Sequence, residues 1–424
     1  MLQLNYIRDN KEEVLKRLAI KNFKDAEQII HSVIELDNQR KAAQKQADDT
    51  KAEANSLAKQ IGELMKSGKR DEAEQLKVKT AELKNSEKLF DEKQKTIEAE
   101  VQALLVTVPN VPHMSVPVGK TPEDNQVVLE EAVKPILHTS AQPHWELTSK
   151  YDIIDFELGV KLTGAGFPVY KGKGARLQRA LINFFLDRAT AKGYHEIQPP
   201  ILVNEDSGYG TGQLPDKEGQ MYHATVDNLY LIPTAEVPVT NIYRDVILKE
   251  SDFPIKNCGY TPCFRREAGS YGKDVRGLNR LHQFDKVEIV QISKPEDSYR
   301  ILDEMSLHVQ GLLEKLELPY RKLLLCGGDM GFNSAITYDM EVYSAAQQRW
   351  LEVSSVSNFE TFQANRLKLR YKNKEGKMQL LHTLNGSALA LPRIVASILE
   401  NNQTEKGIKI PAVLIPYTGF EWID

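Results

Sequence analysis

The sequence is poor in cysteine, has no long apolar run and lacks closely paired histidines. Among its 424 residues are three cysteines, Cys258, Cys263 and Cys326. Their spacing fits no metal-ligand motif, so we interpret them as reduced thiols in a reducing compartment. The nine histidines include no HExxH pair, and we therefore expect no structural zinc. No apolar run approaches the roughly 20 residues that a membrane helix needs, so we expect no membrane partner.

The start of the chain and its overall charge narrow the class of protein further. The first residues, MLQLNYIRDNKEEVLKRLA, are charged throughout and contain no apolar signal-peptide core, which favours a cytoplasmic location. Charged residues make up 27% and hydrophobic residues 41%, values typical of a soluble globular protein, and the length allows two or three domains. The formal net charge is −4, so any nucleic-acid surface must come from local clusters of basic residues.

A helical pattern dominates the first quarter of the chain. Seam positions recur three and four residues apart in two runs of equal length, which Ser67-Gly68 separates. This spacing predicts an antiparallel helical hairpin over about residues 28–105, with a reach of roughly 50–60 Å. The seam residues are Val33, Leu36, Arg40, Ala43, Ala47, Thr50, Ala54, Leu57, Ile61 and Leu64, and then Ala73, Leu76, Thr80, Leu83, Glu87, Phe90, Gln94, Ile97, Val101 and Leu104.

Charged residues cover the flanks of this hairpin, and for most of them we expect a solvated surface. A basic subset near the tip also suits contact with a phosphate backbone: Lys59, Lys66, Lys69, Arg70 and Lys77. Prolines follow the second helix. We therefore expect an N-terminal domain over residues 1–110, a linker over 111–125 and a second domain over 126–424.

A basic strand–loop–strand over residues 261–290 stands out in the second part. Its connecting stretch holds five basic residues against two acids, and loops on rigid strands often carry function. Arg265 lies at the end of the first strand, and Glu267, two residues on, is predicted to share its face. Phe284 and Glu288 share a face of the return strand. These side chains suit a nucleotide and a cationic small molecule, and a surface hairpin with cross-strand ion pairs explains them equally well.

Shorter segments precede this stretch. Residues 174–192 have the spacing of an amphipathic helix. Residues 194–203 resemble a strand that two prolines bend, which favours a sheet edge at a subunit contact. The glycines at 208, 210 and 212 lack the context of a phosphate loop, and we expect a flexible loop there. A further strand ends at Thr234-Ala235-Glu236, which suits an ammonium or hydroxyl group but is more often a helix cap.

Two segments near the C-terminus carry further candidates. Strand alternation predicts Trp350, Glu352 and Ser354 on one face and Leu351, Val353 and Ser355 on the other. A carboxylate with neighbouring hydroxyls suits magnesium, although an exposed glutamate on an edge strand is an equal alternative. Residues 380–400 are predicted to form a strand, a turn at Asn385-Gly386 and a helix. Pro392 suits the first turn of that helix, and Arg393 adds charge to an anion-friendly N-terminus.

In order and spacing, these segments closely resemble those of the bacterial-type seryl-tRNA synthetases, which are class II aminoacyl-tRNA synthetases. The resemblance covers essentially the whole chain. It implies an α+β fold in which helices flank a mostly antiparallel sheet, with an N-terminal coiled-coil arm. It also implies a serine–tRNA ligase, which activates L-serine with ATP to seryl-adenylate, releases pyrophosphate and transfers serine to the 3′ end of serine tRNA. Selenocysteine tRNA is a second candidate acceptor.

The resemblance further assigns roles to single residues. It implies catalytic roles for Arg265, Glu352 and Arg393. The implied ATP site comprises Arg265, Arg266, Glu267, Phe284, Glu352, Val353, Ser354, Ser355 and Arg393, with magnesium at Glu352 and Ser355. The implied serine pocket comprises Thr234, Ala235, Glu236, Arg265, Glu288, Asn385 and Ser387. The implied tRNA contacts are the five basic residues at the tip of the hairpin, Lys273 and Arg276. A homodimer contact over residues 177–203 is implied as well.

Within the ATP site the resemblance is more specific. It implies that Arg265 touches the α-phosphate and the serine carboxylate, that Glu267 binds the adenine amino group and that Phe284 stacks on adenine. Arg393 would meet the γ-phosphate. The last segment, NGSALALPR, departs from the NGSGLAVGR of many members, because Ala388 and Pro392 replace glycines. We therefore expect the local backbone there to differ from theirs.

Two other classes of protein share part of this pattern. An aminoacyl-adenylate ligase that charges a carrier protein would lack the long hairpin. A coiled-coil scaffold with an inactive globular part has no need to keep Arg265, Glu267, Glu352 and Arg393 together. ATP–pyrophosphate exchange in the presence of serine separates the scaffold from the two ligases, and tRNA charging separates the ligases from each other.

Overall fold

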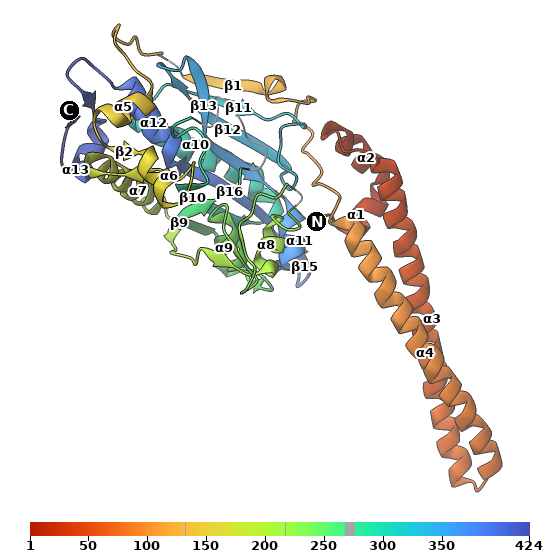
Figure 1. Cartoon of the computed structure of the whole chain (residues 1–424). Helices are drawn as coiled ribbons and strands as arrows, with labels where there is room; N and C mark the ends of the chain where they lie inside the picture. Colours follow the sequence, from red (N-terminus) through yellow and green to blue (C-terminus); the bar gives the residue numbers. More distant parts are fainter. Residues whose placement is uncertain (132, 217, 268–275) are drawn as a thin grey trace. The chain divides into compact units, whose positions relative to one another are not determined.

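The computed structural model describes residues 1–131, 133–216, 218–267 and 276–424, and Figure 1 shows the whole chain. Its contacts divide it into two compact units, Met1–Ala19 with Phe23–Pro109 and Ile20–Asn22 with Asn110–Asp424. Among the helices described, none is long and apolar enough to cross a membrane.

The α-helices are α1 (Leu4–Asp9), α2 (Lys11–Ile20), α3 (Ala26–Lys66), α4 (Arg70–Leu105), α5 (His144–Lys150), α6 (Phe156–Leu162), α7 (Gly172–Thr190), α8 (Glu205–Thr211), α9 (Glu236–Asn241), α10 (Ser298–Lys315), α11 (Thr361–Leu367), α12 (Leu391–Asn401) and α13 (Ile415–Thr418). The strands are β1 (Gln126–Glu131), β2 (Ile154–Asp155), β3 (Val169–Tyr170), β4 (His195–Glu196), β5 (Leu202–Val203), β6 (His223–Ala224), β7 (Leu229–Leu231), β8 (Ile247–Leu248), β9 (Ile255–Phe264), β10 (Gln283–Ser293), β11 (Tyr320–Leu324), β12 (Ile336–Ser344), β13 (Arg349–Asn358), β14 (Arg370–Lys372), β15 (Met378–Leu380), β16 (His382–Ala390), β17 (Ile408–Lys409) and β18 (Trp422–Ile423).

Two long helices form most of the first unit. α3 and α4 lie side by side along the arm (Figure 1). They join at a turn in which Gly68 has a φ of +78°, a conformation that glycine adopts at low cost. Every residue of the predicted seam is buried or partly buried. The predicted helical hairpin is confirmed, because the spacing of three and four residues places one face of each helix in the contact.

A buried carboxylate lies beside the seam, one residue after Leu36. Asp37 is 3% exposed, and its carboxylate oxygens lie 2.6 Å from Lys41 Nζ and 2.9 Å from Arg40 Nη2. Arg8 of α1 is a third cation, 3.8 Å away. Burial alone would raise the pKa of Asp37, but hydrogen bonds from Lys41 and Arg40 outweigh burial and hold the pKa below its ordinary value. The ionised carboxylate therefore stabilises the packing of α1 on α3.

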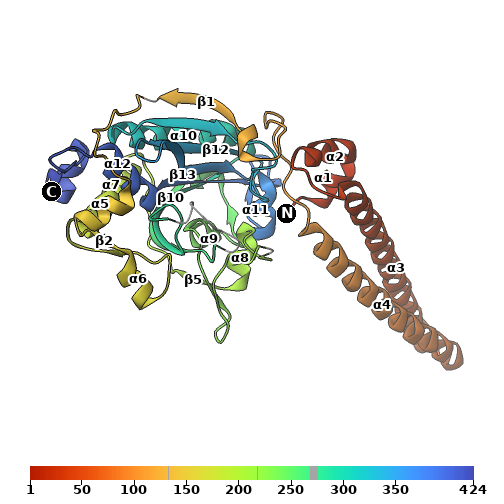
Figure 2. The same cartoon turned by 45° about the horizontal axis from the view of Figure 1, so that its top comes forward.

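An eight-stranded sheet forms the centre of the second unit (Figure 2). Its strand order is β1-β11-β12-β13-β16-β10-β9-β4. Neighbouring strands are antiparallel except for β4, which ends the sheet and pairs parallel with β9. The expected α+β fold with a mostly antiparallel sheet is confirmed.

The alternation of side chains along β10 separates the hydrophobic core from the cavity described below. Val287 and Ile289 are buried in the main core, to which α7, α10 and α12 contribute their apolar faces. Lys286 and Glu288 point to the opposite side of the strand and line the cavity. The packing that holds β10 in place therefore also fixes its polar side chains.

Two local predictions around residue 200 were wrong. Residues 194–203 do not form one bent strand, because β4 and β5 belong to different sheets and the two prolines between them cannot donate ladder hydrogen bonds. The three neighbouring glycines lie in α8 and its C-terminal cap, not in a flexible loop. A Cβ atom on Gly210 would lie 2.6 Å from Leu367 Cδ2, so close packing accounts for this glycine.

The predicted turn at Asn385-Gly386 was also wrong. Both residues lie inside β16, where they pair with Val290 and Ile289 of β10. A Cβ atom on Gly386 would lie 3.2 Å from Val356 Cγ2 of the neighbouring strand, so packing across the sheet outweighs the local turn preference. The helix after it, α12, has Pro392 in its first turn as predicted.

We expect Asp37→Asn to destabilise the first unit by about 1–3 kcal/mol at neutral pH, because it removes the charge from two charge-assisted hydrogen bonds. The stabilisation by ionised Asp37 is fully present above the ordinary pKa of about 3.9. It is lost as the pH falls through the lower folded-state pKa, so wild type and variant should converge in acid. Thermal unfolding followed by circular dichroism measures both effects. Asp49→Asn, at an exposed position of the same helix, is the control, and equal melting temperatures of Asp37→Asn and wild type at pH 7 would contradict the assignment.

Candidate active site

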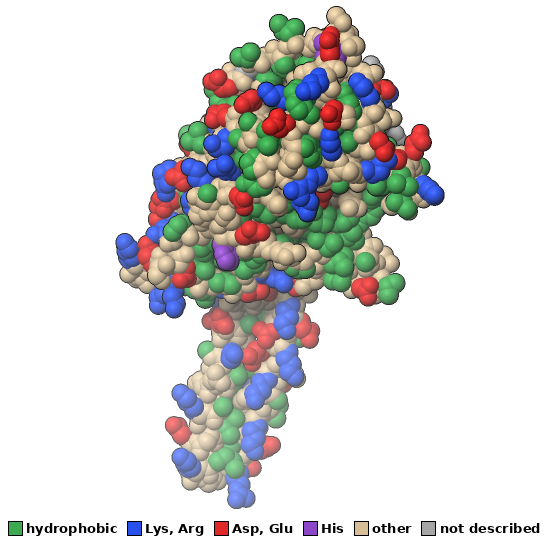
Figure 3. Space-filling view, turned by 90° about the vertical axis from the view of Figure 1, so that its left-hand side faces the viewer, with side chains coloured by type: hydrophobic (Ala, Val, Ile, Leu, Met, Phe, Trp, Pro, Cys, Tyr) green, Lys and Arg blue, Asp and Glu red, His purple; other side chains and the backbone are tan. Residues whose placement is uncertain are grey.

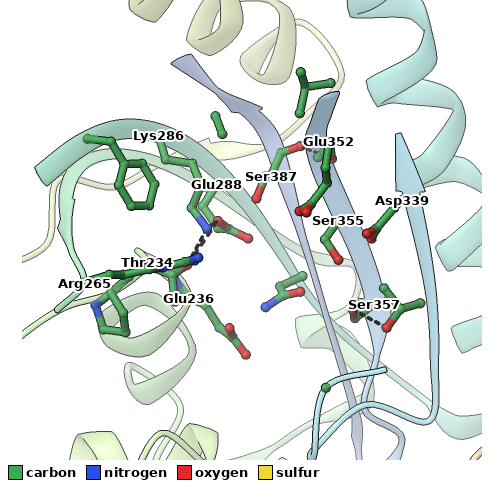
Figure 4. Close-up of a pocket in the computed structure, with 18 of the residues that line it drawn as sticks. Thr234, Glu236, Arg265, Lys286, Glu288, Asp339, Glu352, Ser355, Ser357 and Ser387 are labelled. Carbon is green, nitrogen blue, oxygen red and sulfur yellow. Dashed lines mark hydrogen bonds and ion pairs between the residues drawn. The ribbon is translucent and has the colours of Figure 1, made fainter. Parts of the chain in front are cut away.

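A cavity of about 620 Å³ lies on the side of β10 that carries Lys286 and Glu288 (Figure 4). Its walls come from β10, β12, β13, β16, α9, the start of α12 and the segment that follows β9. The predicted residues that line it are Thr234, Glu236, Arg265, Glu267, Phe284, Glu288, Glu352, Val353, Ser354, Ser355, Asn385, Ser387 and Arg393. Residues more than 150 positions apart in the sequence thus meet in one cavity.

Two of the residues predicted to bind ATP or serine, Ala235 and Arg266, are not among those that line the cavity. Ala235 is fully buried in a separate apolar cluster, and Arg266 is exposed. Arg276 packs over the ring of Trp145, with its Cζ 4.6 Å from the ring centroid, and its guanidinium lies 3.3 Å from Glu146. Lys273 lies outside the described residues.

Three side chains form a buried polar cluster on one wall. Lys286 Nζ lies 2.6 Å from Glu288 Oε2 and donates a hydrogen bond of 2.9 Å to Thr234 Oγ1. Thr234 in turn donates to Glu288 Oε2 at 3.1 Å and accepts the backbone N–H of Glu236 at 3.2 Å. Sequence reasoning missed Lys286, although its period-two spacing with Phe284 and Glu288 placed it on their face.

Glu236, the first residue of α9, is a buried carboxyl group beside this cluster. Gln363 Nε2 donates to its Oε1 at 2.6 Å, and the Asn385 side chain is a second hydrogen-bond partner. Burial, and next the charge of Glu288, raise the pKa of Glu236 to about 7. A cation bound beside Glu236 would favour its ionised form, so this wall suits a small ammonium compound.

Arg265 and Phe284 form another part of the cavity lining and contact each other. The guanidinium carbon of Arg265 lies 5.2 Å from the Phe284 ring centroid, and its Nε donates to Pro233 O at 3.4 Å. Arg265 directly follows β9, as predicted. Glu267 does not share a strand face with it, because the strand has ended and Glu267 adopts a φ of +49°. Glu267 instead pairs with Arg280 at 2.7 Å.

A β-bulge in β13 brings Glu352 and Ser355 to one face. Glu352 pairs with Glu341 of β12, and Ser355 pairs with Asp339 of β12, so Val353 is an extra residue in the ladder. The predicted alternation was therefore wrong at Ser354 and Ser355. Figure 4 shows Glu352, Ser355 and Asp339 directed into the same space. β13 also lies between β12 and β16, which rules out the edge-strand alternative.

Asp339, which sequence reasoning missed, adds a carboxylate to the two predicted oxygen donors, Glu352 and Ser355. Its pKa is raised well above the ordinary value by burial and then by the charge of Glu352, and its Oδ1 is buried without a hydrogen-bond partner among the described residues. Asp339, Glu352 and Ser355 together offer two carboxylates and a hydroxyl, which fits a magnesium ion that keeps water or phosphate ligands. Within the described residues, no group of three or more His, Cys, Asp and Glu side chains is arranged to hold a metal by itself.

Arg393 stands at the rim of the cavity on the first turn of α12. Its Nη1 donates to the backbone oxygen of Glu352 at 2.7 Å and lies 3.6 Å from the Glu352 carboxylate. Its Nε donates to Asn279 O at 3.0 Å. Two guanidinium groups, Arg265 and Arg393, thus line the same cavity as the oxygen atoms of Asp339, Glu352 and Ser355. The two cations suit a polyphosphate, and the buried glutamates in the same lining suit an ammonium group.

Comparisons with known proteins agree with this geometry. Residues 1–112 match the model of the seryl-tRNA synthetase N-terminal domain, and residues 221–402 match that of the tRNA synthetase class II core domain (G, H, P, S and T). The chain is 51% identical to a serine–tRNA ligase of Salinibacter ruber, covering 99% of this chain and 98% of the relative, and 48% identical to one of Chlorobium luteolum, covering 100% and 99%. Its structure resembles that of seryl-tRNA synthetase from Pyrococcus horikoshii complexed with ATP, with a TM-score of 0.93, 32% identity and coverage of 100% of this chain and 99% of that one.

We expect Glu236→Gln to stabilise the ligand-free protein above pH 7 and to leave its stability unchanged below about pH 4.5. A carboxyl group whose folded-state pKa is raised contributes stability below its unfolded pKa and loses that contribution as the pH rises through about 7. Glutamine mimics the protonated form and keeps the oxygen that accepts from Gln363. Melting temperatures across pH 4–9 test this, and the gain should be at most about 3 kcal/mol. A gain that does not depend on pH would show that Glu236 does not titrate near neutrality.

Proposed function

Since this chain belongs to the seryl-tRNA synthetase family and is an ATP-dependent serine–tRNA ligase, we propose that its cavity forms seryl-adenylate and that its hairpin binds the tRNA. The observation that carries the proposal is the junction of two subsites in one cavity. A cationic subsite with Arg265 and Arg393 adjoins an anionic one with Glu236 and Glu288. This is the arrangement that a reaction between a polyphosphate and an amino acid requires.

The anionic wall would hold L-serine. Glu236 and Glu288 suit the ammonium group, and the hydroxyl group has Thr234, Asn385 and Ser387 within the same lining. Ala235 shapes this wall only through its backbone and its buried neighbours. Because these polar groups are buried, an amino acid without the hydroxyl would leave some of them unpaired, and such a loss costs far more than a missing methyl group.

The cationic side would hold ATP. The Arg265 guanidinium contacts Pro233 O, next to Thr234 of the anionic wall, so it suits both the α-phosphate and the serine carboxylate. Phe284 offers a ring for adenine, Glu267 an acceptor for its amino group, and Arg393 a charge for the γ-phosphate. Val353 and Ser354 line the same wall. Arg266 remains a proposed ATP contact through its backbone carbonyl, because its N–H already donates to Gln220 O at 2.8 Å.

Asp339, Glu352 and Ser355 would hold magnesium. The ion would neutralise charge on the phosphates when bound. The protein itself then contributes position and charge. The serine carboxylate oxygen attacks the α-phosphorus of ATP, the bond to the bridging oxygen breaks and pyrophosphate leaves. A hydroxyl group of the terminal adenosine of tRNA next attacks the seryl carbonyl, and AMP leaves. Neither step uses a protein nucleophile.

The hairpin would bind tRNA. Figure 3 shows Lys and Arg side chains along the arm. Lys59, Lys66 and Arg70 are exposed near its tip, whereas Lys69 and Lys77 pair with Glu72 and Glu74 at 3.0 and 2.9 Å. We assign all five to the long variable arm of serine tRNA, with the larger contribution from the first three.

The remaining assignments follow the same division. Residues 1–110 would form the tRNA-binding domain, 111–125 the linker and 126–424 the catalytic domain, with Arg276 and Lys273 near the acceptor end. β4 ends the central sheet, and Ile201 and Leu202 beyond it are exposed. Both features support a homodimer contact over residues 177–203.

Selenocysteine tRNA is a second proposed acceptor. The three free cysteines fit a cytoplasmic location.

We expect Arg265→Ala to reduce serine-dependent ATP–pyrophosphate exchange by at least about 100-fold, because it removes a charge that faces the reacting phosphate. Arg265→Lys should recover only part of the activity, since lysine cannot make the two-pronged contact. Arg266→Ala is the matched control and should retain most activity, because its side chain is exposed outside the cavity. Exchange by Arg265→Ala within tenfold of wild type would remove Arg265 from the reaction.

We expect combined alanine substitution of Lys59, Lys66 and Arg70 to weaken serine-tRNA binding while exchange stays normal. The slope of log affinity against log salt should become shallower by about 2–3, because each lost phosphate contact removes nearly one released counterion. Filter binding at several salt concentrations measures this. The matched control replaces the ion-paired Lys69 and Lys77 and should have the smaller effect. An unchanged tRNA affinity in the triple variant would exclude the tip from the tRNA interface.

A further inference from the structure

A buried hydrogen-bond network lies behind Arg393, outside the residues assigned to ATP or serine. His144 of α5 and Glu400 of α12 are both fully buried. His144 Nδ1 lies 2.6 Å from Glu400 Oε1, which also accepts the backbone N–H of His144 at 2.9 Å. Ser344 donates to the other carboxylate oxygen of Glu400. Neither His144 nor Glu400 lines the cavity, so any effect on the proposed reaction must act through other residues.

The hydrogen bonds fix the state of this imidazole. His144 Nε2 accepts a hydrogen bond of 2.8 Å from the backbone N–H of Leu278, and a backbone nitrogen can only donate. His144 is therefore the neutral tautomer with its proton on Nδ1, which it donates to Glu400. Burial alone would raise the pKa of Glu400, but hydrogen bonds from His144 and Ser344 outweigh burial and keep the pKa below its ordinary value.

The network ends at the backbone that holds Arg393. Leu278 and Asn279 are consecutive, and Asn279 O accepts the Nε–H of Arg393 at 3.0 Å. The Asn279 side chain donates to Gln347 Oε1 at 3.1 Å, and Gln347 Nε2 donates to Glu400 Oε1 at 2.9 Å. The contacts thus close into a ring around the Asn279 backbone, and this ring leaves the Asn279 carbonyl directed at the guanidinium.

Helix geometry and close packing make the ring rigid. Arg393 and Glu400 are seven residues apart on α12, which is about two helical turns, so they lie on nearly the same side of it. Gly277 comes so close to the ring that a Cβ atom there would lie 2.2 Å from His144 Nε2. Any side chain at this position would displace the imidazole.

We propose that His144 and Glu400 are positioning residues, which hold the Asn279 carbonyl where it orients Arg393 toward ATP. This inference rests on the proposed contact of Arg393 with ATP. Without the acceptor at Asn279, the Arg393 guanidinium keeps its contact to the Glu352 backbone but loses the second point that fixes its plane. Misplacement of a contact group by about 1 Å is enough to reduce a rate by about 100-fold.

The test is His144→Phe, which keeps an aromatic side chain and removes the hydrogen bonds of the imidazole to Glu400 and to the Leu278 backbone. In ATP–pyrophosphate exchange we expect a loss in kcat of about tenfold or more and a raised KM for ATP. The KM for serine should stay within about twofold. Among the described residues, the side chains of the serine wall make no hydrogen bond to the network of His144, Glu400 and Gln347. His308→Phe is the control. His308 is partly buried on α10, and its Nε2 has no hydrogen-bond partner among the described residues. Equal effects on both KM values, or unchanged kinetics, would overturn the proposal.

A second variant protects the test against a folding defect. Gln347→Met alters a partly buried residue and cuts the ring at two bonds, so it should show the same selective effect on ATP with smaller size. Normal ATP kinetics in this variant would overturn the proposal even if His144→Phe does not fold.

A double-mutant cycle separates the inference from the function on which it rests. If His144 acts through Arg393, His144→Phe should cost at least about threefold less in an Arg393→Ala background than in wild type. Additive losses would overturn the positioning role and leave the role of Arg393 intact. If Arg393→Ala alone leaves exchange unchanged, the role of Arg393 fails, and the positioning role fails with it.

Discussion

The cavity depends on two opposite charges that are buried on the same strand. Lys286 and Glu288 are 5% and 2% exposed, and either charge alone would carry a large desolvation cost. Their direct contact, with Thr234 as a third member, makes a polar wall possible in the interior. Among the described residues Glu236 forms no ion pair of its own, and its burial raises its pKa although the charge of Lys286 acts in the opposite direction. β10 thus carries a buried ion pair, Lys286 with Glu288, and the charge of Glu288 also raises the pKa of the neighbouring Glu236.

Local spacing explains what could be predicted from the sequence. The hairpin repeats one pattern over many turns, so single polar seam positions such as Arg40 do not hide it. Arg265, Phe284 and Glu288 follow strand alternation close to one loop, and Lys286 was available by the same argument. Asp339 was not, because it reaches the cavity through the register between β12 and β13, and that register contains a bulge. Register is a tertiary property.

The errors have a common physical origin. Glycines at 210 and 386 suggested flexibility or a turn, but both serve the close approach of neighbouring side chains. Asn-Gly has a strong turn preference in isolation, and pairing on both sides of β16 overrides it.

In helix α12, local pattern and tertiary packing agree. Its buried apolar residues pack in the core, while Arg393 and Glu400 place polar groups at its two ends, so core packing also aligns the chemistry at its start.

On the proposed serine site, the raised pKa of Glu236 links amino-acid binding to the release of protons. Near pH 7 the free protein carries this carboxyl group partly protonated. If the amino acid binds beside Glu236 as proposed, its ammonium group favours the carboxylate, and the bound proton leaves to the buffer. The heat of that binding step then includes the ionisation enthalpy of the buffer, and the apparent affinity is linked to the hydrogen-ion concentration. If serine binds here as proposed, one buried side chain exchanges a proton for the ammonium group of the amino acid.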